Sequence, residues 1–205
     1  GSPDVCDYLD CLVAAGREQA FFRVLFDYLR SSGIAEFDAG HVRARSRLMR
    51  SGVPVARSLG LSVVCQREEI TFSRELPGSF EEYLEMLSGK QRHEARRKLR
   101  KFSSAGVAVY HPYGQGAKPG EALGVFLRLF RESRSDKDAF LTPAREAFFL
   151  DIAGELSRSG LLHLGILTLD ERPVAAVFCC DYNRTRFLYN SGYDLRYRGL
   201  SAGLV

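Results

Sequence analysis

The alternation of apolar and polar residues near the end of the chain predicts three consecutive β-strands. The runs at 161–169, 174–182 and 186–193 are rich in β-branched, aromatic and aliphatic residues. Turn-forming residues separate them, with Asp-Glu-Arg-Pro after the first run and Asn-Arg-Thr after the second. Strands joined by such short turns pair with their chain neighbours, so we expect an antiparallel meander.

Two Ser residues ahead of this meander fit the starts of helices. Ser79 is followed three residues later by Glu82, and Ser88 is followed by Gln91, which is the capping-box arrangement in both cases. The two boxes predict two helical pieces that meet at Gly89.

Apolar residues at helical spacing predict further helices at 17–29, 121–134 and 142–160. Shorter apolar runs predict strands at 4–14, 34–38, 57–66, 69–73 and 107–110. Helices that precede an antiparallel meander are typical of an α+β fold. The stretch Leu76-Pro77-Gly78 is the clearest domain boundary, because Pro and Gly interrupt regular structure. The abrupt start and end of the sequence suggest a piece of a longer polypeptide.

Composition adds little to this picture. The 45% hydrophobic and 26% charged content is ordinary for a soluble globular protein. No apolar run approaches the roughly 20 residues that a membrane span requires, and the opening residues lack a signal-peptide pattern. The 5 Cys residues include no CxxC pair. Reduced thiols in the cytoplasm therefore fit better than a disulfide framework or a metal site, and we expect no metal.

The net charge of +4 is unevenly distributed. Between 89 and 101, seven Lys or Arg residues face a single acidic residue, Glu94. One interpretation is a solvated helix face, since charge runs often lie on the surface. The other is a site for an anionic ligand, such as a nucleotide phosphate, an anionic acceptor or RNA, held by Arg92, Arg96, Arg97 and Arg100. Few aromatic residues accompany these cations, so nucleic acid is the least favoured partner.

A second candidate for anion binding follows the last predicted strand. Arg198-Gly199-Leu200-Ser201-Ala202-Gly203 combines a cation with small residues that allow close backbone approach. Such a loop between a strand and a helix presents backbone N–H groups to a phosphate. The alternative is a simple strand-to-helix turn with Ser201 as the helix N-cap.

Several motifs, in order, resemble one family. They are LPGSFEEYLEMLSGKQRHEARRKLRKF, FLTPAREAFF, RPVAAVFCCDYNRTRFLYNSGYD and GLSAG. Together they are similar to the cellulose-biosynthesis-associated (CelD-like) acetyltransferases of the GNAT superfamily, which are related to the Fem peptidoglycan aminoacyl transferases. The resemblance implies a GNAT-like mixed sheet with an antiparallel meander flanked by helices. It also implies parts of two tandem GNAT-like domains, with 1–75 in the first and 76–205 in the second, incomplete after its phosphate-binding loop.

The resemblance further implies an N-acyltransferase that uses acetyl-CoA, or another acyl-CoA, as donor. Its pyrophosphate loop has a basic or Gln residue, two variable positions, Gly, one variable position, and Gly or Ala. Arg198 takes the first place and Gly203 the last, while Ser201 stands where Gly is usual. The cofactor-binding residues are then Arg198, Gly199, Ser201, Ala202 and Gly203, and the strand at 186–193 would pair with the pantetheine arm.

Transfer in such a family is direct, from donor to a small-molecule or cell-envelope amine, so Cys179 and Cys180 need not act as nucleophiles. Asp194 and Tyr193, at the end of the last strand, are the candidate catalytic residues. Two alternatives remain. One is a Fem-like aminoacyl transferase that uses aminoacyl-tRNA, and the other is a non-catalytic module for an anionic ligand on a GNAT fold.

Overall fold

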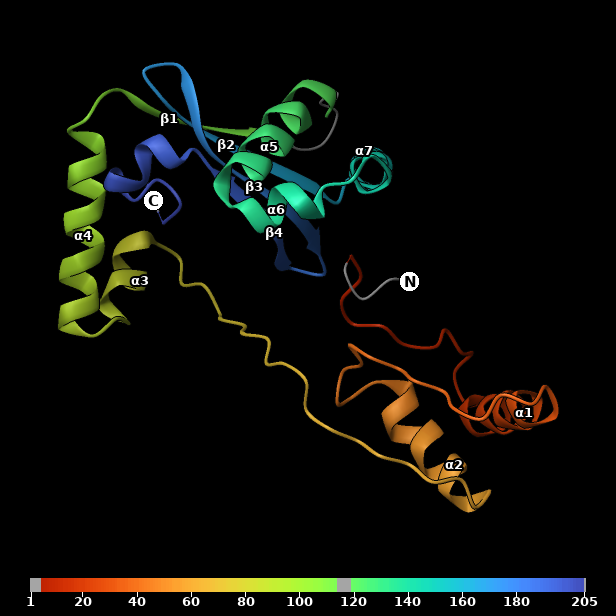
Figure 1. Cartoon of the computed structure of the whole chain (residues 1–205). Helices are drawn as coiled ribbons and strands as arrows, with labels where there is room; N and C mark the ends of the chain where they lie inside the picture. The colour runs from red at the N-terminus through yellow and green to blue at the C-terminus, as the bar shows by residue number, and fades with distance from the viewer. Residues whose placement is uncertain (1–4, 114–118, 205) are drawn as a thin grey trace. The chain divides into compact units, whose positions relative to one another are not determined.

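The computed structural model describes residues 5–113 and 119–204, and the chain divides into two compact units, Gly1–Glu75 and Leu76–Val205 (Figure 1). The first unit contains helix α1 (Glu18–Ser31), the π-helical turn η1 (Leu48–Gly52) and helix α2 (Val53–Ser58). The predicted helix at 17–29 is therefore confirmed. Phe22 and Phe26 of α1 are buried against Leu48, Val55 and Ala56, which form the small core of this unit.

The strands predicted for the first unit are wrong. Within the described residues 5–75, the only β-type pairing is an isolated bridge between Leu9 and Val42, and α2 takes the start of the run at 57–66. A strand requires a partner of matching length for its backbone hydrogen bonds. Here the apolar side chains instead pack singly against the helical core, as Cys11, Leu61 and Val63 do.

The second unit alternates helices and strands. Its elements are α3 (Phe80–Glu85), α4 (Gly89–Ser103), β1 (Ala108–Tyr113), α5 (Gly120–Ser133), α6 (Ser135–Phe140), α7 (Pro143–Arg158), β2 (Leu162–Leu169), β3 (Arg172–Tyr182), β4 (Thr185–Tyr193) and the 3-10 helix η2 (Leu195–Leu200). The predicted caps at Ser79 and Ser88 are confirmed, because their side chains each accept a backbone N–H at the start of α3 and α4. Thr142 caps α7 in the same way. Ser88 and Gln91 form a full capping box. Helix α6 was not predicted.

The four strands pair in the order β1-β2-β3-β4, and each pairing is antiparallel. Two-residue turns join the last three strands. Asp170 and Glu171 have φ of 47° and 64°, and Asn183 and Arg184 have φ of 48° and 59°. Such left-handed pairs match the twist of the flanking strands, which makes these tight hairpins. The predicted meander and the α+β fold are confirmed, with tighter turns than the sequence indicated.

Side chains alternate between the two faces of the sheet. Leu164, Ile166 and Phe178 point to one face, where they are buried against Phe126 of α5 and Phe149 of α7. The ring centroids of Phe126 and Phe178 are 5.6 Å apart, and those of Phe149 and Phe178 are 6.0 Å apart. These aromatic contacts form the main core of the unit.

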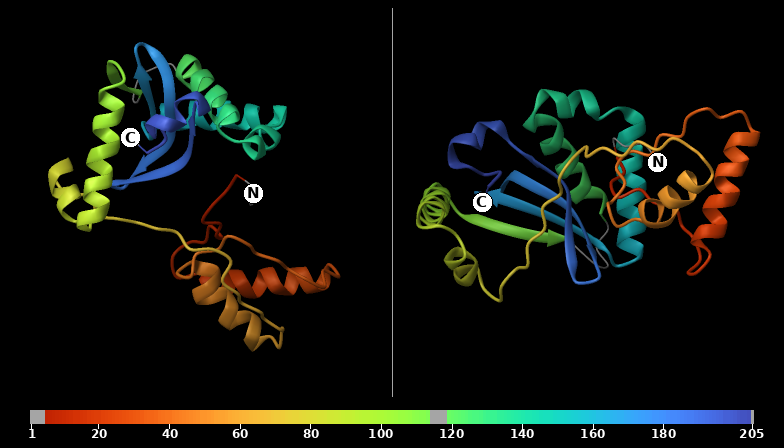
Figure 2. Two further views of the ribbon diagram at one scale, coloured as in Figure 1. Left: turned by 60° about the vertical axis from the view of Figure 1, so that its left-hand side comes forward. Right: turned by 90° about the horizontal axis from the view of Figure 1, so that it is seen from below.

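A second, smaller core lies on the opposite face. Phe102 of α4, Leu169 of β2, Val174 and Ala175 of β3, and Ala202 after η2 are buried together. Figure 2 shows α4, in yellow-green, on the other side of the strands from the green and teal helices α5 to α7. The end of the described chain is thus packed against α4 rather than lying free.

Gly192 of β4 sets how closely α5 approaches the sheet. A Cβ atom at this position would lie 2.5 Å from the Cα of Phe130, which is backbone of α5 and has no room to move. We expect Gly192→Ala to lower the free energy of unfolding by about 1–3 kcal/mol, because the helix must shift off the strand. Urea unfolding followed by circular dichroism measures this.

The matched control for Gly192 is Gly124, where an added Cβ atom meets nothing within 4 Å. Gly124→Ala, in the middle of α5, is expected to raise stability by about 0.5–1 kcal/mol through helix propensity. If Gly192→Ala were as stable as the wild type, the close packing of α5 on β4 would be contradicted.

Candidate functional site

The segment after β4 begins at Asp194, which caps η2. Its carboxylate accepts the backbone N–H of Arg196 at 2.9 Å and the Arg196 side chain at 3.0 Å from Nε and 2.6 Å from Nη2. Only 3% of Asp194 is exposed. The hydrogen bonds from the Arg196 guanidinium lower the pKa of Asp194, against the opposing effect of burial. Asp194 is therefore ionised and engaged at neutral pH.

The predicted phosphate-binding residues lie in the last turn of η2 and the turn that follows. Ser201 has φ of 61° and is the C-cap of η2. Residues 201–204 form a turn. Ser201 N–H donates to the carbonyl of Arg198 at 3.1 Å, and Leu204 N–H donates to the carbonyl of Ser201 at 2.8 Å.

Between these two bonds lie two backbone N–H groups without an acceptor in the described part of the chain, those of Ala202 and Gly203. The side chain of Ala202 is buried, whereas Gly203 is exposed. Consecutive N–H groups of this kind form a concave site for an anion. Arg198 is exposed on the same turn, and no ion pair of its side chain occurs among the described residues.

Tyr193, the last residue of β4, supports this turn. A Cβ atom at Gly203 would lie 2.9 Å from Cδ1 of the Tyr193 ring, so a glycine is what lets the turn lie against the ring. The Tyr193 ring also packs against the small core around Phe102 and Ala202. The turn is thus held by Tyr193 and the buried Ala202, while Gly203 is exposed.

The edge of β4 borders the same turn. β4 pairs with β3 alone in the described residues, and the register shifts between Phe178 and Cys179, where Tyr189 is the extra residue of β4. An unpaired strand edge offers N–H and C=O groups to an extended ligand. Cys179 is not available for this chemistry, because desolvation raises the pKa of its buried thiol to about 11.

Most of the basic residues of α4 are engaged within the unit. Arg92 donates to the carbonyls of Leu84, Glu85 and Leu87 at 3.0–3.3 Å and so closes the C-terminal end of α3. Arg96 contacts Glu81 at 2.6 Å, and Arg97 forms two hydrogen bonds with Glu94 at 2.8 and 2.7 Å. Of the four arginines predicted to hold an anion, only Arg100 has no such partner in the described residues.

Lys101 is the residue of α4 that sequence reasoning did not single out. Its Nζ atom donates to the carbonyl of Gly199 at 2.7 Å, across 98 positions of the sequence. The available signal was its neighbour Phe102, the buried residue of α4. The residue beside a buried position lies at the border of the packed face, so its side chain lies next to the segment that the helix contacts.

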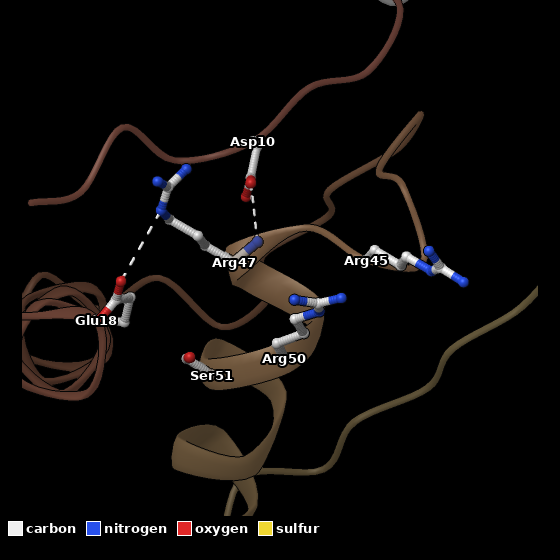
Figure 3. A pocket seen from close by; sticks show the side chains of 6 residues that line it. All are labelled: Asp10, Glu18, Arg45, Arg47, Arg50 and Ser51. Atoms are coloured by element: carbon white, nitrogen blue, oxygen red, sulfur yellow. Dashed lines mark hydrogen bonds and ion pairs between the residues drawn. The ribbon is translucent and has the colours of Figure 1, made fainter. Parts of the chain in front are cut away.

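Two shallow hollows lie elsewhere. One, of about 390 Å³, is in the first unit and is lined by Asp10, Glu18, Arg45, Arg47, Arg50 and Ser51 (Figure 3). In this hollow the carboxylate of Asp10 accepts the backbone N–H groups at the start of η1, those of Arg47 at 2.8 Å and Leu48 at 3.1 Å. The other, of about 630 Å³, lies along α7 between Leu150 and Arg158. Neither hollow contains a residue of the predicted site.

The described residues contain no cluster of three or more His, Cys, Asp or Glu residues placed to hold a metal ion. None of their helices combines the length and the apolar character that crossing a membrane requires.

Comparison with known proteins connects this geometry to a family. No match was found among curated proteins. The family model described as an acetyltransferase (GNAT) domain matches residues 89–205, from the first residue of α4 to the end of the sequence. GNAT domains are acyltransferases that generally take acyl-CoA donors and an amine acceptor. Because the match covers more than half of the 205 residues, the chain belongs to the GNAT acetyltransferase-domain family.

Proposed function

We propose that this protein is an N-acyltransferase that binds an acyl-CoA, acetyl-CoA in the simplest case, at the turn after β4. The observation that carries the proposal is the pair of N–H groups of Ala202 and Gly203, which have no acceptor among the described residues and lie on the same turn as Arg198. Backbone N–H groups and an arginine are the donors that a pyrophosphate requires. A CelD-like acetyltransferase related to the Fem enzymes is the finer assignment that we propose within the family.

The reaction follows from where the donor would lie. With its pyrophosphate on the turn, the pantetheine arm runs along β4, an edge strand of the described sheet, at the end of the strand next to the turn. The amine of a small-molecule or cell-envelope acceptor attacks the thioester carbonyl, the C–N bond forms, and the C–S bond breaks with release of the CoA thiolate. Holding the two reactants in line supplies most of the acceleration. No enzyme nucleophile takes part, in keeping with the buried Cys179 thiol.

Asp194 and Tyr193 serve this site by holding the turn. Both carboxylate oxygens of Asp194 accept hydrogen bonds from Arg196, and the Tyr193 ring supports Gly203. A carboxylate whose pKa is lowered is a weak base, so proton removal from the amine falls to another group. The 5 free cysteines fit the proposed cytoplasmic location, where thiols stay reduced.

The internal partners of Arg92, Arg96 and Arg97 favour an acyl-CoA over aminoacyl-tRNA as donor, since these cations are already engaged. The same observation weighs against a non-catalytic module that holds an anionic polymer along α4. Steep salt dependence of tRNA binding would support the Fem-like alternative instead.

Acetyl-CoA is expected to raise the thermal unfolding temperature of the intact protein. At a ligand concentration about a hundredfold above Kd, the gain in unfolding free energy is about 2.7 kcal/mol. Arg198→Glu is expected to abolish the gain, because it places a negative charge beside the phosphates. The matched control is Arg184→Glu, which changes an exposed arginine at the other end of β4 and should keep the stabilisation by acetyl-CoA. No stabilisation of the wild type by any acyl-CoA contradicts the proposal.

Asp194→Asn tests the positioning role through pH. The pKa of Asp194 is lowered in the folded protein, so its ionised form adds stability above the unfolded pKa of about 3.9. This contribution is lost as the pH falls through the lower folded pKa. The variant should be less stable by about 1 kcal/mol at pH 7, with the difference closing below about pH 4. Urea unfolding across this range measures the difference.

Asp151→Asn, at an exposed position of α7, is the control for Asp194→Asn and should leave stability nearly unchanged at every pH. If Asp194→Asn instead lost turnover while keeping wild-type stability, Asp194 would be the general base and the positioning role would be refuted.

A further inference from the structure

Helix α4 contacts the proposed donor site through the small apolar core that contains Phe102 and Ala202. Phe102 is 1% exposed and packs with Ala202, which is 2% exposed. Figure 1 shows α4 beside the dark-blue end of the chain, and Figure 2 shows the same proximity from another side. The helix precedes the first strand of the sheet, yet it borders the turn that follows the last one.

That contact places Lys101 on the turn. Its Nζ atom donates to the Gly199 carbonyl at 2.7 Å, which lies in the same short segment as Arg198 and Gly203. An ammonium group has three N–H donors. In the described residues, Lys101 contacts no carboxylate, and the Gly199 carbonyl is its one hydrogen-bond acceptor. Two donors of an exposed cation therefore remain at the turn.

The acidic groups near the turn are already neutralised. Asp194 is held by Arg196, and Glu132 of α5 contacts Arg128 at 3.2 Å. On α4, Lys98 contacts Glu94 at 3.4 Å, and Arg97 contacts Glu94 at 2.7 Å. Among the described residues of this turn and its contact with α4, Lys101 and Arg198 are cations without a carboxylate partner, and two such cations suit an anion with two phosphates.

We infer that Lys101 is a phosphate-binding residue of the donor site, contributed by α4. While one N–H holds the Gly199 carbonyl, the other two reach the pyrophosphate linkage of the acyl-CoA, opposite Arg198. The inference rests on the proposed function, since it names a further ligand for the same donor. The overall charge of α4 does not reveal this role, which belongs to one lysine near the C-terminal end of the helix.

The test compares two donors on the intact protein by isothermal titration calorimetry. Acetyl-CoA carries the pyrophosphate, and acetyl-pantetheine lacks it. Lys101→Met is expected to weaken acetyl-CoA binding about tenfold, because one charge-assisted hydrogen bond is lost, and to leave acetyl-pantetheine unaffected. Lys101→Arg should retain most of the affinity. Lys90→Met, at the opposite end of α4, is the matched control and should bind both compounds like the wild type.

Each other outcome is decisive. Equal binding of acetyl-CoA by Lys101→Met and the wild type overturns the inference and leaves the proposed function intact. Equal weakening of both compounds overturns it too, since Lys101 would then only hold the turn in place. If Lys101→Met bound acetyl-dephospho-CoA as tightly as the wild type does, the pyrophosphate assignment would be overturned, because Lys101 would then contact the 3′-phosphate. No acetyl-CoA binding by the wild type refutes the proposed function itself.

Discussion

The packing of Phe102 against Ala202 is the constraint on which the candidate site depends. Ala202 sits in a small core with Leu169 and Val174, on the face of the sheet opposite α5. Because this one methyl group is buried, the backbone on either side of it is fixed. Among the described residues, the N–H groups of Ala202 and Gly203 have no acceptor of their own. If the proposed anion binds there, the turn is already fixed and little reorganisation is needed.

The local features of the second unit were predictable from sequence, because they depend on residues close together in the chain. The caps at Ser79, Ser88 and Thr142 and the β2–β4 meander each follow from a few neighbouring side chains. The strands expected before residue 75 fail because pairing depends on a distant partner that apolar runs do not identify. In the described part of the first unit, a single bridge at Leu9 is all that pairs.

The site itself was only half predictable. The position of the proposed phosphate-binding residues follows from the motif around Ser201. The motif does not reveal that Ser201 ends a 3-10 helix or that Gly203 lies against the Tyr193 ring. The hydrogen bond from Lys101 to Gly199 joins residues 98 positions apart. The neighbour Phe102 marks the packed side of α4, but it does not indicate which distant segment Lys101 contacts. Long-range contacts of this kind exist only once the sheet is assembled.

The basic helix shows why a run of charge does not by itself identify a ligand site. Its arginines include one that closes α3, Arg92, and two that pair with carboxylates, Arg96 and Arg97. An anion site is better indicated by the cations that have no carboxylate partner. Among the described residues at the turn, these are Lys101 and Arg198. In the proposed site the helix and the turn bind one anion together, whereas the sequence presents them as two separate candidates.

The turn after β4 is the proposed binding site for the pyrophosphate of an acyl-CoA, and backbone amide NMR during titration with acetyl-CoA tests this. The amide signals of Ala202 and Gly203 are expected to shift downfield together and to saturate at one Kd, since each N–H gains a phosphate acceptor. Binding of acetyl-CoA with these two signals unmoved would contradict it.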